Sequence, residues 1–293
     1  MNRLLIVDGH AYAYRAFHAI RELRGPEGLP TNAIYGFVKM LEKMRLHLQP
    51  THLMVVWDGG LSAARMTALP EYKAQRPSMP DDLRPQLDEI SNYLAAAGLA
   101  SYCGEGVEAD DYIACLARRA AENGWDVVIA SSDKDFMQLV STRIGLLNPN
   151  DKTGAVWTRA QVVAKAGVEP EQVADWLALM GDTVDNIPGV PGVGPKTAAE
   201  LVKQFGSVSV LFERLGEVKS EKLRMALRAA EANVRRNLEL VRLHEVPCEF
   251  AAAQLTLKPA DRNRLRELFQ SWGFKGMLAE LESQPEERQA ELI

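Results

Sequence analysis

The chain has 293 residues, of which 47% are hydrophobic, and a formal net charge of −5 at pH 7. This size and composition suit a globular protein with one large domain and a smaller helical appendage, and no apolar run is long enough for a signal peptide or a membrane span. The acidic balance does not by itself indicate a nucleic-acid partner, and three cysteines without metal-ligand spacing favour a reducing, cytoplasmic setting over a disulfide framework or a zinc site.

Three short apolar runs each lead directly into acidic residues. They are residues 4–7 before Asp8, 53–57 before Asp58, and 127–130 before Ser131, Ser132 and Asp133. Such continuous runs are typical of buried parallel strands, and the helical patterns between them predict an α/β fold with a mainly parallel sheet flanked by helices. Because function gathers at the carboxyl ends of such strands, we expect the site there.

Three further regions differ in character from this strand and helix alternation. Residues 59–85 lose strong apolar periodicity and carry Pro70, Pro77 and Pro80, which predicts a long, partly mobile excursion from the core. Residues 172–250 form helical patterns joined by Gly and Pro turns, which predicts an all-helical module. Residues 251–293 contain a strand-like stretch near residue 255, a helix opening near Asp261 and a polar tail at 284–291 that is expected to fray. The predicted domains are therefore 1–171, 172–250 and 251–293.

The acids that stand out form five small groups separated by apolar or helical stretches. The groups are Asp8; Asp58; Glu108 with Asp110 and Asp111; Asp133 with Asp135; and Asp182 with Asp185. Each alone has a structural alternative as a helix cap, a turn former or an acidic first turn that complements the helix dipole. If the strand ends are neighbours, however, the carboxylates converge and repel one another unless cations neutralise them. Hard oxygen ligands of this kind suit Mg²⁺ or Mn²⁺.

A glycine-rich turn at residues 189–199 opens a helix, so its backbone N–H groups can receive a phosphate. A purely structural connection between two helices is the alternative. Basic residues that follow would line a duplex track or form solvated helix faces. They are Lys196, Lys203, Lys219, Lys222, Arg224, Arg228, Arg235 and Arg236.

Taken together, these residues resemble the 5′ nuclease domain at the N-terminus of bacterial DNA polymerase I and the phage and free-standing bacterial 5′–3′ exonucleases. The matching stretches are residues 5–10 with Tyr14, Arg15 and Phe17, then 56–58, 72–77, 106–111, 132–135 and 181–189. They occur in the order of the family and cover essentially the whole chain. The resemblance implies a PIN-like α/β core with a helical arch at about residues 60–86, followed by a helix–three-turn–helix DNA-binding module.

The resemblance also implies two or more divalent ions, Mg²⁺ or Mn²⁺, held by two groups of acids. The first group is Asp8, Asp58, Glu108, Asp110 and Asp111, and the second is Asp133, Asp135, Asp182 and Asp185. Every one of these positions is acidic in this chain. A K⁺ ion at the glycine-rich turn is a further expectation.

Cationic and aromatic residues are assigned by the same match. Lys73 and Arg76 belong to the arch and Arg15 lies beside the core, where they would hold the phosphodiester and offset charge at phosphorus. Arg15 has pairing with a structural acid as its alternative. Tyr72 would stack on a base, with a place in the core as the alternative. The duplex backbone would be gripped by Gly189, Val190, Gly192, Val193, Gly194, Lys196 and Thr197.

The predicted function is a monomeric, metal-dependent 5′–3′ exonuclease or flap endonuclease that cuts DNA, or an RNA primer–DNA hybrid, at 5′ ends or flaps during replication and repair. The resemblance ends near Leu281, so no fused polymerase is expected, and both a free-standing protein and an isolated domain fit. One alternative is a structure-specific DNA-binding protein with weak or no cleavage. The other is a PIN-type ribonuclease.

Overall fold

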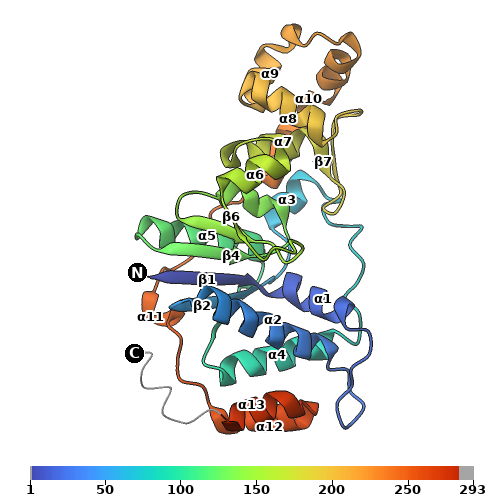
Figure 1. Cartoon of the computed structure of the whole chain (residues 1–293). Coiled ribbons are helices and arrows are strands. Elements are labelled where there is room, and N and C mark those ends of the chain that lie inside the picture. The colour runs from blue at the N-terminus through green and yellow to red at the C-terminus, as the bar shows by residue number, and fades with distance from the viewer. Residues whose placement is uncertain (1, 284–293) are drawn as a thin grey trace. The chain divides into compact units, whose positions relative to one another are not determined.

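The computed structural model describes residues 2–283 (Figure 1). These residues form two compact units. The first unit consists of the described residues of Met1–Asp58, Ser78–Cys103 and Glu249–Ile293, and the second of Gly59–Pro77 and Gly104–Cys248. The polar tail predicted to fray at residues 284–291 lies outside the described part of the chain.

The first unit is built on three parallel strands in the order β3-β2-β1. They are β1 (Arg3–Asp8), β2 (His52–Trp57) and β3 (Ala100–Cys103). Strands β1 and β2 are almost wholly buried, which confirms the two strands predicted from their apolar runs. Strand β3 alternates between half-buried and exposed residues, so it lacks the continuous apolar run that identified the others.

Helices cover this sheet, and their bounds are α1 (Gly9–Ala19), α2 (Asn32–Leu48), α4 (Arg84–Ala96), α11 (Ala252–Leu255), α12 (Arg262–Trp272) and α13 (Lys275–Ser283). Helices α1 and α2 approach closely because Gly36 has no side chain; a Cβ there would lie 2.8 Å from that of Ala16. The helix predicted near Asp261 is α12, which Asp261 caps. The strand-like stretch near residue 255 was predicted wrongly. It forms the short helix α11, and only Thr256 makes a bridge, to His52.

The second unit has strands β4 (Asp126–Ala130), β5 (Ile144–Leu147) and β6 (Val156–Trp157), with β4 and β5 parallel and β5 and β6 antiparallel. The buried strand β4 confirms the third predicted strand. Helix α5 (Ala109–Glu122) and the short helix α6 (Arg159–Ala166) accompany them. The segment predicted as an arch contains α3 (Ala63–Ala68), followed by turns, before α4 begins.

The rest of the second unit is mainly helical. Its helices are α7 (Val173–Met180), α8 (Pro195–Phe205), α9 (Val208–Glu213) and α10 (Glu221–Val241), with short 3₁₀ turns η1 (Lys134–Leu139), η2 (Pro170–Gln172) and η3 (Leu215–Glu217). Between α7 and α8 the chain forms a small antiparallel hairpin of β7 (Gly181–Asp182) and β8 (Ile187–Pro188). The long helix α10 packs against α7 through a buried face that includes Val234 and Leu238.

Both units therefore combine parallel strands with flanking helices, which is the α/β class predicted from the sequence. Within residues 2–283, no helix combines the length and the apolarity needed to cross a bilayer.

Candidate metal centre

The first unit places two of the predicted acids at the ends of neighbouring parallel strands. Asp8 ends β1 and Asp58 follows β2, whose Val56 pairs with Asp8 in the sheet. Asp8 is buried and caps α1, its Oδ1 accepting a 3.0 Å hydrogen bond from the backbone N–H of Ala11. A cap and a metal ligand are compatible roles, because an ionised carboxylate has about four lone-pair sites.

Helix α1 carries a histidine and an arginine in addition to the cap. The backbone N–H of Asp58 donates to Nδ1 of His10 at 3.1 Å. Burial lowers the pKa of His10, against the opposing charge of Asp58, so the ring is neutral and accepts this bond. Arg15 is exposed on the same helix, and its charge opposes the rise in the pKa of Tyr12 that burial causes. Arg15 is thus a surface cation on the helix that Asp8 caps.

In the second unit, Glu108 precedes α5 and is surrounded by donors. Its Oε2 pairs with Nζ of Lys73 at 2.5 Å, and its Oε1 accepts from the backbone N–H of Ser62 at 2.9 Å and lies 3.3 Å from Arg65. Burial alone would raise the pKa of Glu108, but Lys73 and Arg65 outweigh it and hold that pKa below its usual value. Glu108 is therefore ionised and already faces cations of the protein.

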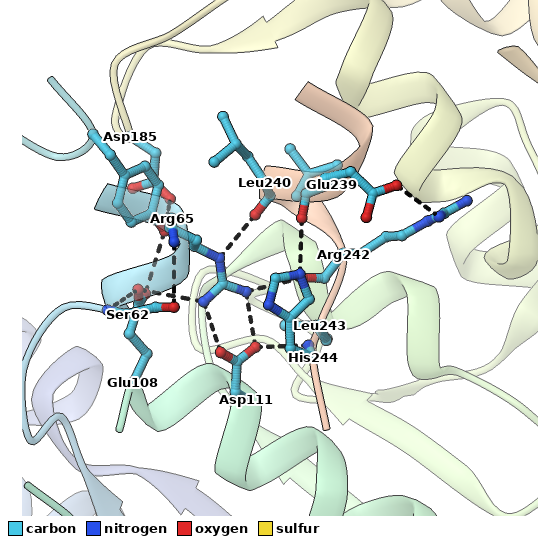
Figure 2. A network of polar contacts seen from close by, with 12 residues as sticks. Ser62, Arg65, Glu108, Asp111, Asp185, Glu239, Leu240, Arg242, Leu243 and His244 are labelled. Carbon is cyan, nitrogen blue, oxygen red and sulfur yellow. Dashed lines mark hydrogen bonds and ion pairs between the residues drawn. The ribbon is translucent and has the colours of Figure 1, made fainter. Parts of the chain in front are cut away.

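Asp111, in the first turn of α5, is held by a buried arginine (Figure 2). The guanidinium of Arg65 binds both carboxylate oxygens, at 2.7 and 2.8 Å, and the backbone N–H of His244 donates to Oδ1 at 2.8 Å. Arg65 also donates to the carbonyls of Leu240 and Arg242 at the end of α10, at 3.0 and 2.9 Å. Asp111 thus takes part in a structural ion pair, and the ligand role expected for it stays a prediction.

Tyr72 and Lys73 are buried in the second unit, with only 4% and 5% of their surface exposed. The Tyr72 hydroxyl lies 3.2 Å from Glu108 Oε2 and 3.3 Å from Asp185 Oδ2, and burial together with these two charges raises the pKa of Tyr72, so the group stays a donor. A buried ring offers no face to a base. In this structure Tyr72 lies in the core, and its stacking on a base stays a prediction.

The backbone at Lys73 is unusual. Its φ of 57° lies in the left-handed region, which non-glycine residues seldom adopt, and its N–H donates to the carbonyl of Asp185 at 3.0 Å. Strain of this kind persists where the surroundings enforce it and is frequent at functional sites. The expected cation at position 73 is present, but it points at a carboxylate of the chain itself.

Asp182 and Asp185 lie on the β7–β8 hairpin, and both are buried. Asp185 Oδ1 pairs with Arg76 at 2.7 Å, and Asp182 Oδ2 pairs with Nζ of Lys134 at 3.0 Å. Asp182 Oδ1 also accepts from the backbone N–H of Val184, as the predicted turn role requires. The hairpin therefore presents two carboxylates, each matched to a partly exposed cation.

Asp133 and Asp135 follow β4 and have a different environment. Asp133 Oδ1 accepts from the backbone N–H of Asp135 at 2.8 Å, whereas the buried Oδ1 of Asp135 has no hydrogen-bond partner in the structure. Burial raises the pKa of Asp133, with Asp185 and Asp182 adding to it. Burial likewise raises the pKa of Asp135, which Asp133, Asp110 and the hairpin acids raise further. Acids from α5, the β4 end and the hairpin therefore lie near one another.

This environment fits a divalent cation. A hard divalent cation would bind the buried carboxylate oxygen that has no hydrogen-bond partner. It would also stabilise the ionised form of the carboxyl groups whose pKa is raised. Within residues 2–283, no three His, Cys, Asp or Glu side chains stand in the arrangement of a formed metal site. Protein cations hold Glu108, Asp182 and Asp185 instead. Asp8 and Asp58 belong to the first unit, and their convergence with the other acids stays a prediction.

Arg65 and Lys134 were not predicted as site residues, although both contact predicted ligands. Lys134 lies between Asp133 and Asp135, which was an available signal. Arg65 sits in the segment without periodicity, where nothing marks it as buried. Only its tertiary contacts identify it.

The glycine-rich turn forms as predicted between the hairpin and α8. Val190 and Val193 are buried and joined by a 3.0 Å backbone hydrogen bond, and Gly192 has a φ of 81° with open space around it. Gly194 caps α8, and Lys196 is exposed in its first turn. Backbone N–H groups at a helix start of this kind are suited to bind a phosphate.

Two family models match the chain. One, described as 5′-3′ exonuclease, N-terminal resolvase-like domain, matches residues 3–167, and the other, 5′-3′ exonuclease, C-terminal SAM fold, matches residues 168–263. A 5′-3′ exonuclease of Aquifex aeolicus is 39% identical over 284 residues, covering 96% of each chain. DNA polymerase I of Bacillus caldotenax is 37% identical over 99% of this chain, which spans 33% of that relative.

Solved structures agree with these matches. The phage T5 5′-exonuclease with bound divalent zinc ions is 27% identical and has a TM-score of 0.69, over 83% of this chain and 90% of that one. A phage T5 D15 flap endonuclease in a complex with DNA and metal ions shares the fold at 24% identity and a TM-score of 0.69, over 97% of this chain and 100% of that one.

Proposed function

The chain belongs to the 5′–3′ exonuclease family of metal-dependent nucleases, and from this premise we propose that it hydrolyses DNA at 5′ ends and 5′ flaps by a two-metal mechanism. Removal of flaps and RNA primers in replication and repair is the corresponding role. The observation that carries the proposal is the crowding of Asp133 and Asp135, with an unpartnered buried oxygen, beside the acids of the hairpin.

Mg²⁺ is the proposed ion, and Mn²⁺ would substitute for it. Asp133, Asp135, Asp182 and Asp185 would hold one ion, and Asp8, Asp58, Glu108 and Asp110, with Asp111 as a further candidate, would hold the other. When bound, the ions supply an activated water and stabilise the leaving 3′ oxygen.

The cations of the chain have a separate task. Lys73 and Arg76 pair with Glu108 and Asp185, which supports a role for them next to the scissile phosphate. A divalent ion on these carboxylates would take over the neutralising role, and Lys73 and Arg76 would then bind the phosphodiester and offset charge at phosphorus. Arg15, exposed on the helix that follows Asp8, would bind the same strand.

Duplex DNA next to the cut would bind the glycine-rich turn and the start of α8. Gly189, Val190, Gly192, Val193, Gly194, Lys196 and Thr197 would contact the backbone, with a K⁺ ion bound at the turn. Recognition would then rest on strand ends and shape instead of base sequence.

We further propose that the protein is cytoplasmic and acts as a monomer. Sedimentation in the absence of DNA would test the monomeric state.

A labelled 5′-flap duplex tests the proposal. With Mg²⁺ the protein should cut near the flap junction and leave a 5′-phosphate, and EDTA should abolish the cut. Binding without a metal-dependent cut would favour a DNA-binding protein that lacks turnover. Cleavage confined to a single-stranded RNA substrate would favour the ribonuclease alternative.

The proposed contact of Lys196 with the backbone of duplex DNA can be tested separately. Lys196→Ala should weaken binding to duplex and reduce the slope of log affinity against log salt by about 1, without abolishing chemistry. Lys275→Ala is the matched control, because it removes the same charge from an exposed position on α13 in the first unit. Equal slopes in the two variants would contradict a phosphate contact at Lys196.

A further inference from the structure

A buried asparagine of α10 holds both ends of the hairpin that carries Asp182 and Asp185. Asn237 is 0% exposed, and its Nδ2 donates to the carbonyl of Ala178 at 3.1 Å and to the carbonyl of Pro188 at 2.7 Å. Ala178 lies in the last turn of α7, just before β7, and Pro188 ends β8. One amide group therefore fixes the segment that enters the hairpin to the segment that leaves it.

The neck of the hairpin leaves little freedom elsewhere. A Cβ at Gly181 would lie 2.3 Å from the backbone nitrogen of Gly189, and a Cβ at Gly189 would lie 2.1 Å from the carbonyl oxygen of Met180. The two glycines thus let the strands cross in direct backbone contact. Because no side chain fits between them, the separation of the two strands depends on backbone hydrogen bonds and on the Asn237 amide.

The amide at this position satisfies two backbone carbonyls at the cost of one unsatisfied oxygen. Asn237 Oδ1 is buried without a hydrogen-bond partner, which costs desolvation free energy that an apolar side chain of similar size would avoid. The two donor bonds are therefore retained despite an unsatisfied acceptor. Because the two carbonyls belong to the two ends of the hairpin, these bonds also fix the geometry of the hairpin.

The same helix also contacts the acids of α5. The carbonyls of Leu240 and Arg242, at the end of α10, accept from Arg65, which binds Asp111 and lies beside Glu108 (Figure 2). Asn237 is one turn earlier on that helix. Helix α10 therefore contacts both the hairpin and the buried arginine of α3.

We propose that Asn237 is a positioning residue, which sets the place of Asp182 and Asp185 relative to Asp133 and Asp135 and so builds the geometry for the divalent ion of that group. The proposal rests on the proposed function, since it assumes that these acids bind the ion. Because Asn237 is 0% exposed, it would itself contact neither the metal nor DNA.

Asn237→Leu tests the proposal, because leucine fills a similar volume and removes both donors. Two readouts do not depend on cleavage. Hydrogen exchange of the segment 179–190 in the metal-free protein should become about tenfold faster. Mn²⁺ affinity, followed by electron paramagnetic resonance, should fall by about 10–100-fold for one class of site, the range usual for loss of a group that orients metal ligands.

Val234→Ala is the matched control, because Val234 is wholly buried on the same face of α10 one turn earlier and makes no polar contact with the hairpin. It should lower the melting temperature while leaving the Mn²⁺ affinity and the exchange of 179–190 within about twofold of wild type. If Asn237→Leu does not fold, Asn237→Ser gives the same readouts, since the shorter hydroxyl reaches neither carbonyl.

The outcomes separate the two levels of inference. Wild-type protein that binds no Mn²⁺ and cuts no flap would overturn the proposed function itself. Wild type that binds Mn²⁺ and cuts, with the Asn237 variant unchanged in Mn²⁺ affinity and in hairpin exchange, would overturn the positioning role alone. Equal changes in the Asn237 and Val234 variants would also overturn it, since general loosening of α10 would then explain both.

Discussion

Two groups of acids in the second unit obtain their counter-charge from different sources. Glu108 and Asp111, which we call the cation-held acids, are buried against Lys73 and Arg65. Asp133 and Asp135, which we call the crowded acids, have raised pKa values because of burial and neighbouring carboxylates. The cation-held acids are neutralised by the fold. The crowded acids remain under electrostatic stress that a cation from solution would relieve, so the difference supports the proposed metal site at these acids.

The largest effect is expected from removing a crowded acid. Asp135→Asn should lower the rate of flap cleavage by about 10³-fold, equal to roughly 4 kcal/mol, because it deletes a ligand charge at the metal. Affinity for DNA measured in EDTA should be unchanged or higher, since one repulsive charge is gone. A variant that keeps wild-type turnover would end the distinction between the two groups.

The next effect concerns the cation-held acids. Arg65→Met should destabilise the fold by about 3–5 kcal/mol in urea unfolding, because it leaves buried carboxylates without their partner. Adding Asp111→Leu should recover part of the loss, which a double-mutant cycle would measure. A loss below about 1 kcal/mol would show that Asp111 does not depend on Arg65.

A smaller effect depends on pH. The folded-state pKa values of the crowded acids are raised, so these groups cost metal-free stability as pH rises from about 3.9, their unfolded value, through the folded values. The double variant Asp133→Asn, Asp135→Asn lacks this cost. Its stability advantage over wild type in EDTA should therefore be small in acid and grow towards neutral pH, and Mn²⁺ should reduce it.

The pH dependence of Glu108 has the opposite sign. The pKa of Glu108 is lowered, so its contribution is present above its unfolded pKa and is lost as pH falls. Wild type and the double variant share the contribution of Glu108, so it cancels when their stabilities are compared. An advantage that does not change with pH would contradict the raised pKa values of the crowded acids.

The smallest effect is expected at the hairpin. Arg76→Gln should cost no more than about 1 kcal/mol in urea unfolding, because the Arg76 side chain is 39% exposed and solvent screens its pair with Asp185. Turnover should nevertheless fall, since the variant lacks a cation for the phosphate. A stability loss as large as that of Arg65→Met would show that Arg76 is a structural cation like Arg65.

Much of the fold followed from local patterns in the sequence. The buried runs of β1, β2 and β4 and the cap of α12 at Asp261 are local features, so they were predictable. Strand β3 has a half-exposed pattern, so the sequence did not predict it. The stretch near residue 255 is short and apolar, so it was predicted as strand-like although it forms α11. The burial of Tyr72 was not predictable for a different reason, because it depends on Glu108 and Asp185, which are distant in sequence.

By itself, the sequence determined the α/β class, the acidic positions and the glycine-rich turn, because periodicity, strand-end acids and glycine spacing are written in neighbouring residues. Only the tertiary structure decided which acids the protein neutralises with its own cations and which it leaves crowded. The same holds for the clamp of Asn237 on the hairpin. The physical reason is that burial and charge pairing join residues far apart in the chain, and both depend on distances that no local pattern encodes.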